Sequence, residues 1–191
     1  MQAVIHRTLL GLVCCVTPAF PASAEEVKFV DLDGVVIDAS FTRDQVHRRE
    51  GQTISAKMVG TWKVAIEPDH QVRFTYKVVG HTSRGTREAK PVSGIFALDE
   101  KVEVQTRGHG VAMWTFGDGT LTFTRTQEAG AYRFSFSFAA SPNGMTCSVR
   151  EAFAREDGKG EIKLRSPFDG SPVTIISTKL VSSSCKVSKK S

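Results

Sequence analysis

An alternation of apolar and polar side chains at every second residue constrains the fold of this chain more than any other feature. On either side of the turn at 67–70, positions 62–66 and 72–78 each place apolar residues two apart. The same pattern returns at 102–104, 112–116, 121–123 and 132–138. A period of two is that of a half-buried strand, and no segment keeps a helical period beyond about two turns. The sequence therefore predicts an all-β protein.

Turn residues separate these segments at a spacing of roughly ten residues, which is typical of a single antiparallel β-sandwich or β-barrel-like domain of about eight to ten strands. We expect further strands over 35–41, 145–153, 161–164, 173–178 and 182–187. The segment 44–51 is expected to be a loop or one helical turn, and the polar stretch 80–94 a mobile loop. Residues 186–191 are expected to form a flexible basic tail.

The first 24 residues have the parts of a secretory signal peptide. Arg7 precedes an apolar run over 9–16, and Ala22-Ser23-Ala24 forms a small-residue cleavage site before Glu25. The apolar run is shorter than the about 20 residues that span a bilayer, so no transmembrane anchor is expected. The sequence predicts a signal peptide over 1–24, an all-β domain over 25–185, and a periplasmic or extracellular location.

The net charge of the chain is modest. It is +5 for all 191 residues, and without Arg7 the 24 remaining basic residues face 20 acidic ones, which gives +4. Such an excess serves solubility first, and it weakly favours anionic partners such as an envelope polysaccharide or lipid; a protein partner is also considered. Nucleic acid is not an expected partner of an exported chain.

Cysteine usage points to a disulfide. Cys14 and Cys15 belong to the signal segment, so Cys147 and Cys185 are the pair that remains. Two cysteines in an oxidising compartment most simply form a bridge. A metal or redox pair would need another thiol or imidazole close by in sequence, and neither cysteine has one.

Two groups of residues are candidates for ligand binding. His81, Arg84, Arg87 and Lys90 concentrate cations in the polar stretch 80–94, where they could contact an anion or a partner; the alternative is a solvated loop. Trp62 follows a glycine at Gly60 and could line a ligand cavity together with Tyr76, as in lipocalin-like or avidin-like carriers; the alternative is a core position. The aromatic series Tyr132, Phe134, Phe136 and Phe138 is interpreted as core.

Catalytic motifs are missing from the sequence. It has no nucleophile elbow, no paired-histidine zinc helix, no Walker loop and no dinucleotide fingerprint, and the segment 31–34 is interpreted as a turn rather than a calcium loop. We expect no metal and no cofactor. A hydrolase would have to be assembled by the fold from scattered residues, and the candidates are His47, His70, His81, His109, Asp38 and Glu103.

Several stretches of the second half resemble a known group of proteins: "WTFGDGTLTF", "GAYRFSFSF", "MTCSV" and "SPVTIISTKLVSSSCKV". They are similar to an uncharacterised family of exported β-rich proteins from soil alphaproteobacteria of rhizobial type. The resemblance implies export and a bridge between Cys147 and Cys185, and it implies no activity. The function predicted at this point is a non-catalytic β-domain that binds an envelope component or a partner protein through loops; an apolar-ligand carrier and a hydrolase are the alternatives.

Overall fold

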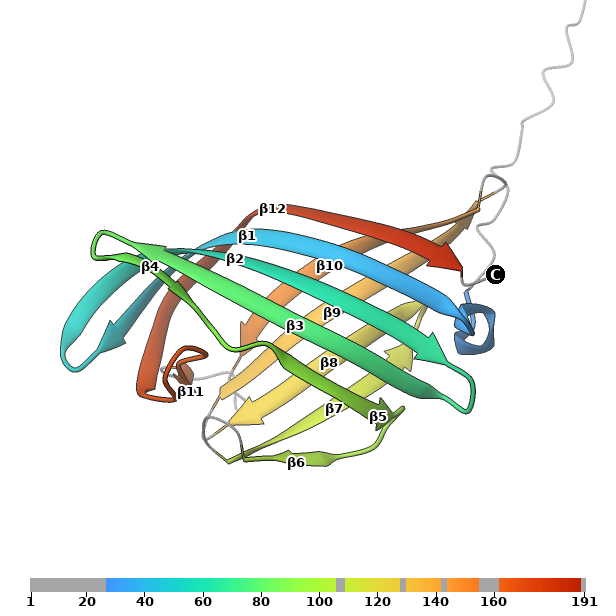
Figure 1. Cartoon of the computed structure of the whole chain (residues 1–191), viewed down its shortest axis with the longest axis horizontal. Coiled ribbons are helices and arrows are strands. Elements are labelled where there is room, and N and C mark those ends of the chain that lie inside the picture. The colour runs from blue at the N-terminus through green and yellow to red at the C-terminus, as the bar shows by residue number, and fades with distance from the viewer. Residues whose placement is uncertain (1–26, 106–108, 128–129, 142–143, 155–161, 190–191) are drawn as a thin grey trace, which may run out of the picture.

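Two antiparallel β-sheets that face each other make up the computed structural model, which describes residues 27–105, 109–127, 130–141, 144–154 and 162–189 (Figure 1). One turn of 3-10 helix, Phe29–Leu32, precedes them. The prediction of an all-β protein is confirmed. The predicted signal peptide lies outside the described residues. Within the described ranges, no helix is long and apolar enough to cross a membrane.

The first sheet has seven strands in the order β11-β12-β1-β2-β3-β4, and β5 also pairs with β3. Their bounds are β1 Val35–Arg49, β2 Gln52–Glu67, β3 Gln71–Thr82, β4 Gly85–Glu88, β5 Val92–Ala97, β11 Ile162–Arg165 and β12 Pro172–Lys189. The β2–β3 hairpin is present as the sequence predicts, and its register places Trp62 opposite Tyr76 and Val64 opposite Phe74. Every ladder in this sheet is antiparallel.

The second sheet has five strands in the order β10-β9-β8-β7-β6. Their bounds are β6 Val102–Val104, β7 Gly110–Gly117, β8 Thr120–Gln127, β9 Gly130–Ser141 and β10 Gly144–Ala154. These strands are joined in sequence order, so each of β7, β8, β9 and β10 pairs with the strand before it.

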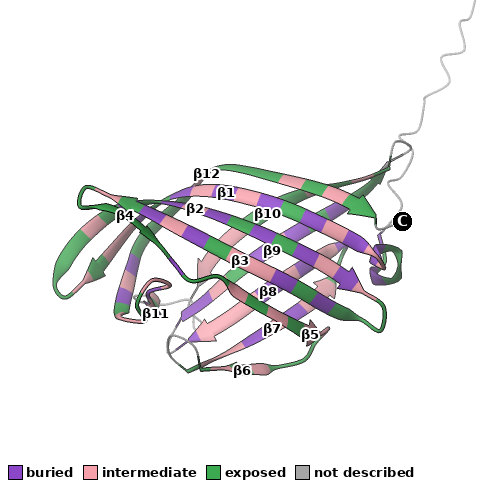
Figure 2. Ribbon diagram, in the orientation of Figure 1, coloured by how far each residue is buried: buried purple, intermediate pink, exposed green. Residues whose placement is uncertain are grey.

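The core lies between the two sheets and is rich in aromatic rings. Buried and exposed residues alternate along β1, β2 and β3 (Figure 2), as a period of two requires. Trp62 of the first sheet meets Trp114 and Phe134 of the second, at ring-centroid distances of 6.0 and 5.2 Å. Phe134 and Phe136 are fully buried, which confirms the interpretation of the β9 aromatic series as core.

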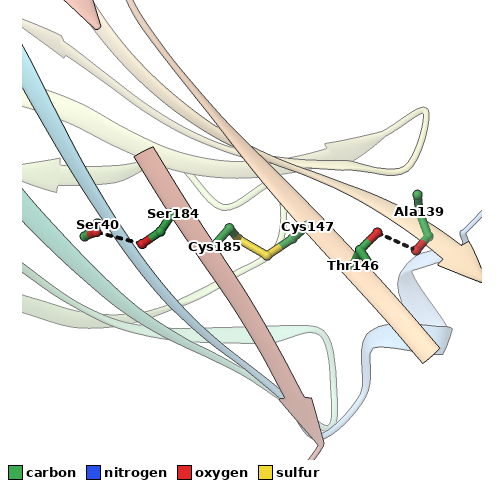
Figure 3. Close-up of a disulfide and its surroundings, with 6 residues drawn as sticks. All are labelled: Ser40, Ala139, Thr146, Cys147, Ser184 and Cys185. Carbon is green, nitrogen blue, oxygen red and sulfur yellow. Dashed lines mark hydrogen bonds between the residues drawn. A yellow bond between two sulfur atoms is a disulfide. The ribbon is translucent and has the colours of Figure 1, made fainter. Parts of the chain in front are cut away.

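The two sheets are linked to each other on both sides of the stack. On one side, the disulfide between Cys147 of β10 and Cys185 of β12 links the sheets (Figure 3), with the two Cα atoms 5.6 Å apart. On the other side, an isolated parallel bridge pairs Leu98 with Trp114. The predicted disulfide is therefore present, and it connects strands that are not neighbours in either sheet.

The first sheet is longer than the second and extends past it. β1 and β2 have 15 and 16 residues, whereas β7 and β8 have eight each. The extension lies at the end that carries the β1–β2 and β3–β4 turns (Figure 1). Among the described strands, none of the second sheet lies opposite that end of the first sheet (Figure 1).

Three segments differ from the sequence-based expectation. Residues 44–49 of the segment 44–51, expected as a loop or helical turn, continue β1; residues 44–48 pair with both β2 and β12, and Arg49 pairs with β2. The expected loop 80–94 contains the end of β3, all of β4 and the start of β5; β4 is exposed at every position, so backbone pairing rather than burial makes it a strand. Residues 172–189 form one continuous strand, so 186–189 of the expected tail pair with β1.

Candidate functional site

The inner face of β1 changes from apolar to polar along the strand. Its first inward residues, from Val35 to Phe41, are apolar and buried in the main core. The same face then continues with Arg43, Gln45, His47 and Arg49. The ladder with β2 stays regular from Val36 to Arg49, so these polar residues point in the same direction as the apolar ones. Polar groups are thus directed inward where the first sheet extends past the second.

Arg43 is the innermost of these residues and forms an ion pair between the sheets. Its guanidinium binds the Glu151 carboxylate of β10, and the two side chains are 5% and 3% exposed. Aromatic rings surround the cation, with Phe153 at 4.7 Å and Phe41 at 5.4 Å from ring centroid to guanidinium carbon. Burial raises the pKa of Glu151, and the Arg43 cation opposes that rise.

Gln45 and His47 connect this ion pair to the end of the sheet. Arg43 Nε donates to Gln45 Oε1 at 3.2 Å, and the Gln45 amide lies 3.2 Å from His47 Nδ1. The pKa of His47 is lowered, first by burial and then by the nearby Arg49 cation. This lowering favours the neutral imidazole, so Arg49 supplies the inward-facing positive charge at this end of β1.

A pocket of about 350 Å³ opens at this end of the first sheet, and we call it the arginine-rimmed pocket. Its apolar lining is Ile54, Ala56, Met58, Phe168 and Val173, with Gly80 and Pro167. Its polar lining is Gln45, His47, Arg49, Glu50, Gln52, Thr82, Arg84, Arg87 and Ser166. Every lining residue of β2 is an even-numbered one, so a single face of that strand forms the floor.

The turn between β11 and β12, residues 166–171, covers part of the pocket. The ring of Phe168 lies over Gly80 so closely that a Cβ there would be 2.8 Å from Phe168 Cζ. The next residue, Asp169, accepts hydrogen bonds from Arg49 Nη1 at 2.8 Å and Arg87 Nη1 at 3.4 Å. A side chain at position 80 would thus displace this ring from its present place against the sheet.

Asp169 is held in its ionised form. Burial by itself would raise its pKa, but hydrogen bonds outweigh that effect and lower the pKa well below its ordinary value. The backbone N–H and the hydroxyl of Ser171 donate to Asp169 Oδ1 at 3.2 and 2.7 Å, and Arg49 adds a charged donor to the other oxygen. The turn therefore presents a permanent negative charge to two of the pocket's arginines.

The cationic residues predicted from the polar stretch are only partly brought together. Arg84 and Arg87, from the β3–β4 turn and β4, both line the pocket. Arg84 Nη2 donates to the neutral Gln52 Oε1 at 2.8 Å, and within the described residues it pairs with no carboxylate. His81 is exposed and bonds to Thr86 instead, at 2.9 Å, and Lys90 lies beyond β4 and outside the pocket lining.

Trp62 and Tyr76, the predicted cavity residues, contact each other in the core. Their ring centroids are 4.5 Å apart, and Trp62 is 2% exposed and packs against Phe123 at 5.2 Å. Neither residue lines the arginine-rimmed pocket. The space around the Trp62 ring is thus occupied by other aromatic side chains.

The residues proposed for a fold-assembled hydrolase stay apart. His47 contacts Gln45, His70 stacks on Phe29 at 5.3 Å, and His81 bonds to Thr86. Among the described residues no hydrogen bond joins two of the six candidates, and no three His, Cys, Asp or Glu side chains gather as metal ligands would.

The comparisons with protein-family models, curated proteins and solved structures found no match to this chain. The resemblance to exported proteins of soil bacteria accordingly stays a prediction.

Sequence reasoning missed five charged residues of this region: Arg43, Arg49, Glu50, Glu151 and Asp169. One available signal was the continuation of the period of two along β1, from Phe41 through Arg43 to Arg49, which places cations on a face that begins as core. No local pattern marks Glu151 or Asp169, because their partners are 108 and 120 residues away in sequence.

Proposed function

We propose that this protein is an exported binding module that holds an anionic group of an envelope component in the arginine-rimmed pocket. The observation that carries the proposal is the arrangement of Arg49, Arg84 and Arg87 around one concave site. Arginine presents several donors in a planar fork that suits carboxylate and phosphate oxygens. A concave site with a few convergent polar groups is the usual form of a small-ligand site.

Arg84 is the residue best placed to receive a new anion. Its partner Gln52 is neutral, whereas Arg49 and Arg87 already share the Asp169 carboxylate. Glu50 adds a second carboxylate near Arg49, at 3.5 Å. Since the three cations exceed the two anions, an anionic ligand gains attraction at the Arg84 side of the pocket.

Two features support the proposed location outside the cytosol. The first 24 residues have the pattern of a secretory signal, and the resemblance to exported proteins agrees with it. The disulfide between Cys147 and Cys185 is a form that persists in oxidising compartments. An envelope component is therefore the class of ligand that such a protein would meet.

The proposal is tested with two double variants that remove the same charge. Arg84→Ala/Arg87→Ala alters the pocket, whereas Lys57→Ala/Arg73→Ala removes two exposed cations from the opposite face of β2 and β3. Each variant is bound to heparin–agarose, which presents a sulfated polysaccharide, and to phosphatidylglycerol vesicles, with phosphatidylcholine vesicles as the neutral comparison.

We expect the pocket variant to lose most of its binding to at least one of the two anionic supports, and the outer-face variant to keep it. The support that shows the difference identifies the class of envelope component. Equal losses in the two variants on both supports would mean that net charge, not the pocket, determines binding, and would refute the proposal.

A further inference from the structure

The arginine-rimmed pocket is divided into an apolar floor and a cationic rim. The floor follows one face of β2, where Ile54, Ala56 and Met58 stand two residues apart. The rim is formed by Arg84 and Arg87, which come from the β3–β4 hairpin on the far side of β3. Ala56 and Met58 are already buried, whereas Ile54 is partly exposed. A ligand that only carries charge would leave the Ile54 side chain uncovered, so the site offers an apolar contact that an anion does not require.

The turn 166–171 already places the matching chemistry over this site. Phe168 sets an aromatic ring against Gly80 and close to Met58, whose Sδ would lie 3.2 Å from a Cβ at position 80. The carboxylate of Asp169, the next residue, accepts hydrogen bonds from Arg49 and Arg87. The chain itself therefore places an apolar ring, followed in sequence by a carboxylate, at this site.

We infer that the ligand is a single-chain anionic amphiphile, with an alkyl chain along the Ile54–Met58 floor and a carboxylate or phosphate head on Arg84 and Arg87. This inference rests on the proposed function and names its ligand class. The pocket volume of about 350 Å³ is near the lower end of the roughly 300–1,000 Å³ typical of ligand sites, so it admits one chain of limited length.

The floor predicts a chain-length dependence. Each methylene group that leaves water strengthens binding about fourfold, until the chain has filled the available space. Longer chains then gain nothing further. Phe168 occupies part of that space, so its removal should move the plateau to longer chains.

The test measures dissociation constants by calorimetry for two series, n-alkyl phosphates and n-alkyl carboxylates, from four to twelve carbons and below their micelle concentrations. Alkyl trimethylammonium salts of the same lengths are the charge control. The variants are Ile54→Ser, its matched control Ile95→Ser at an exposed site, and Phe168→Ala. Thermal melts establish that each variant is folded.

We expect affinity to rise about fourfold per methylene and then level off, in the phosphate series, the carboxylate series or both, with no binding of the ammonium salts. The series that binds identifies the head group. Ile54→Ser should flatten the rise, Ile95→Ser should not, and Phe168→Ala should shift the plateau.

Two results would overturn the inference that the ligand is an amphiphile while leaving the proposed function standing. In the first, affinity does not change with chain length. In the second, neither series binds, although binding to an anionic support still requires Arg84 and Arg87. If the pocket arginines prove irrelevant on both supports, the proposed function fails, and this inference fails with it.

Discussion

Replacing Glu151 by glutamine removes the carboxylate that faces the buried guanidinium of Arg43. Both side chains are at most 5% exposed, so water cannot solvate the charge that remains when its partner is removed. Removing one member of a buried pair typically costs about 3–5 kcal/mol. Since glutamine keeps an oxygen that can accept from Arg43, we expect a loss near 3 kcal/mol, a large share of the roughly 5–15 kcal/mol that stabilises a domain.

Urea unfolding followed by fluorescence measures this loss. The matched control is Glu67→Gln, which breaks the pair between Glu67 and Arg73, where Arg73 is 58% exposed. An exposed pair contributes about 0–1 kcal/mol, so the control should change stability little. A loss of less than about 1 kcal/mol in Glu151→Gln would show that the buried pair behaves like a surface pair, and would refute the reasoning.

The reverse substitution has a predicted pH dependence. Arg43→Met leaves the Glu151 carboxylate buried without the cation that opposes the rise of its pKa. A carboxyl group with a higher pKa in the folded than in the unfolded state stabilises the fold at low pH, and that stabilisation disappears as the pH rises through the folded-state value. We expect Arg43→Met to lose more stability than the native protein between pH 5 and pH 8. The double variant Arg43→Met/Glu151→Leu should not show this extra loss.

Three further outcomes are expected. Reduction of the Cys147–Cys185 bridge, or its replacement by serines, should lower the free energy of unfolding by about 4 kcal/mol, because the bridge closes a 38-residue separation in the unfolded chain; equal urea midpoints with and without reductant would contradict this. Asp169→Asn, which keeps an oxygen for its turn but removes the charge that occupies two arginines, should strengthen binding to the anionic support that the native protein prefers, and weaker binding would oppose the assignment of that site. Gly60→Ala would place a Cβ within the ring of Phe41 and should cost about 1–3 kcal/mol in a thermal or urea melt, whereas an unchanged midpoint would mean that the ring moves freely.

Much of the fold could be predicted because its signal is local. Alternation along a strand depends on side chains two residues apart, so residues such as Trp62, Val64 and Phe134 could be assigned to a core before any strand pairing was known. The polar stretch 80–94 carried no such signal. Its strand β4 forms only through backbone pairing with β3, and an exposed edge strand leaves no apolar pattern to find.

Sequence by itself determined the all-β class, the cysteines of the bridge and two of the pocket's arginines, Arg84 and Arg87, because each depends on residue type and short-range spacing. The pocket was decided by the tertiary structure alone. It exists because β1 and β2 are longer than the strands of the second sheet, and because the turn with Asp169 reaches back across 120 residues to Arg49. Contacts at that separation depend on how the sheets are stacked, which no local periodicity encodes.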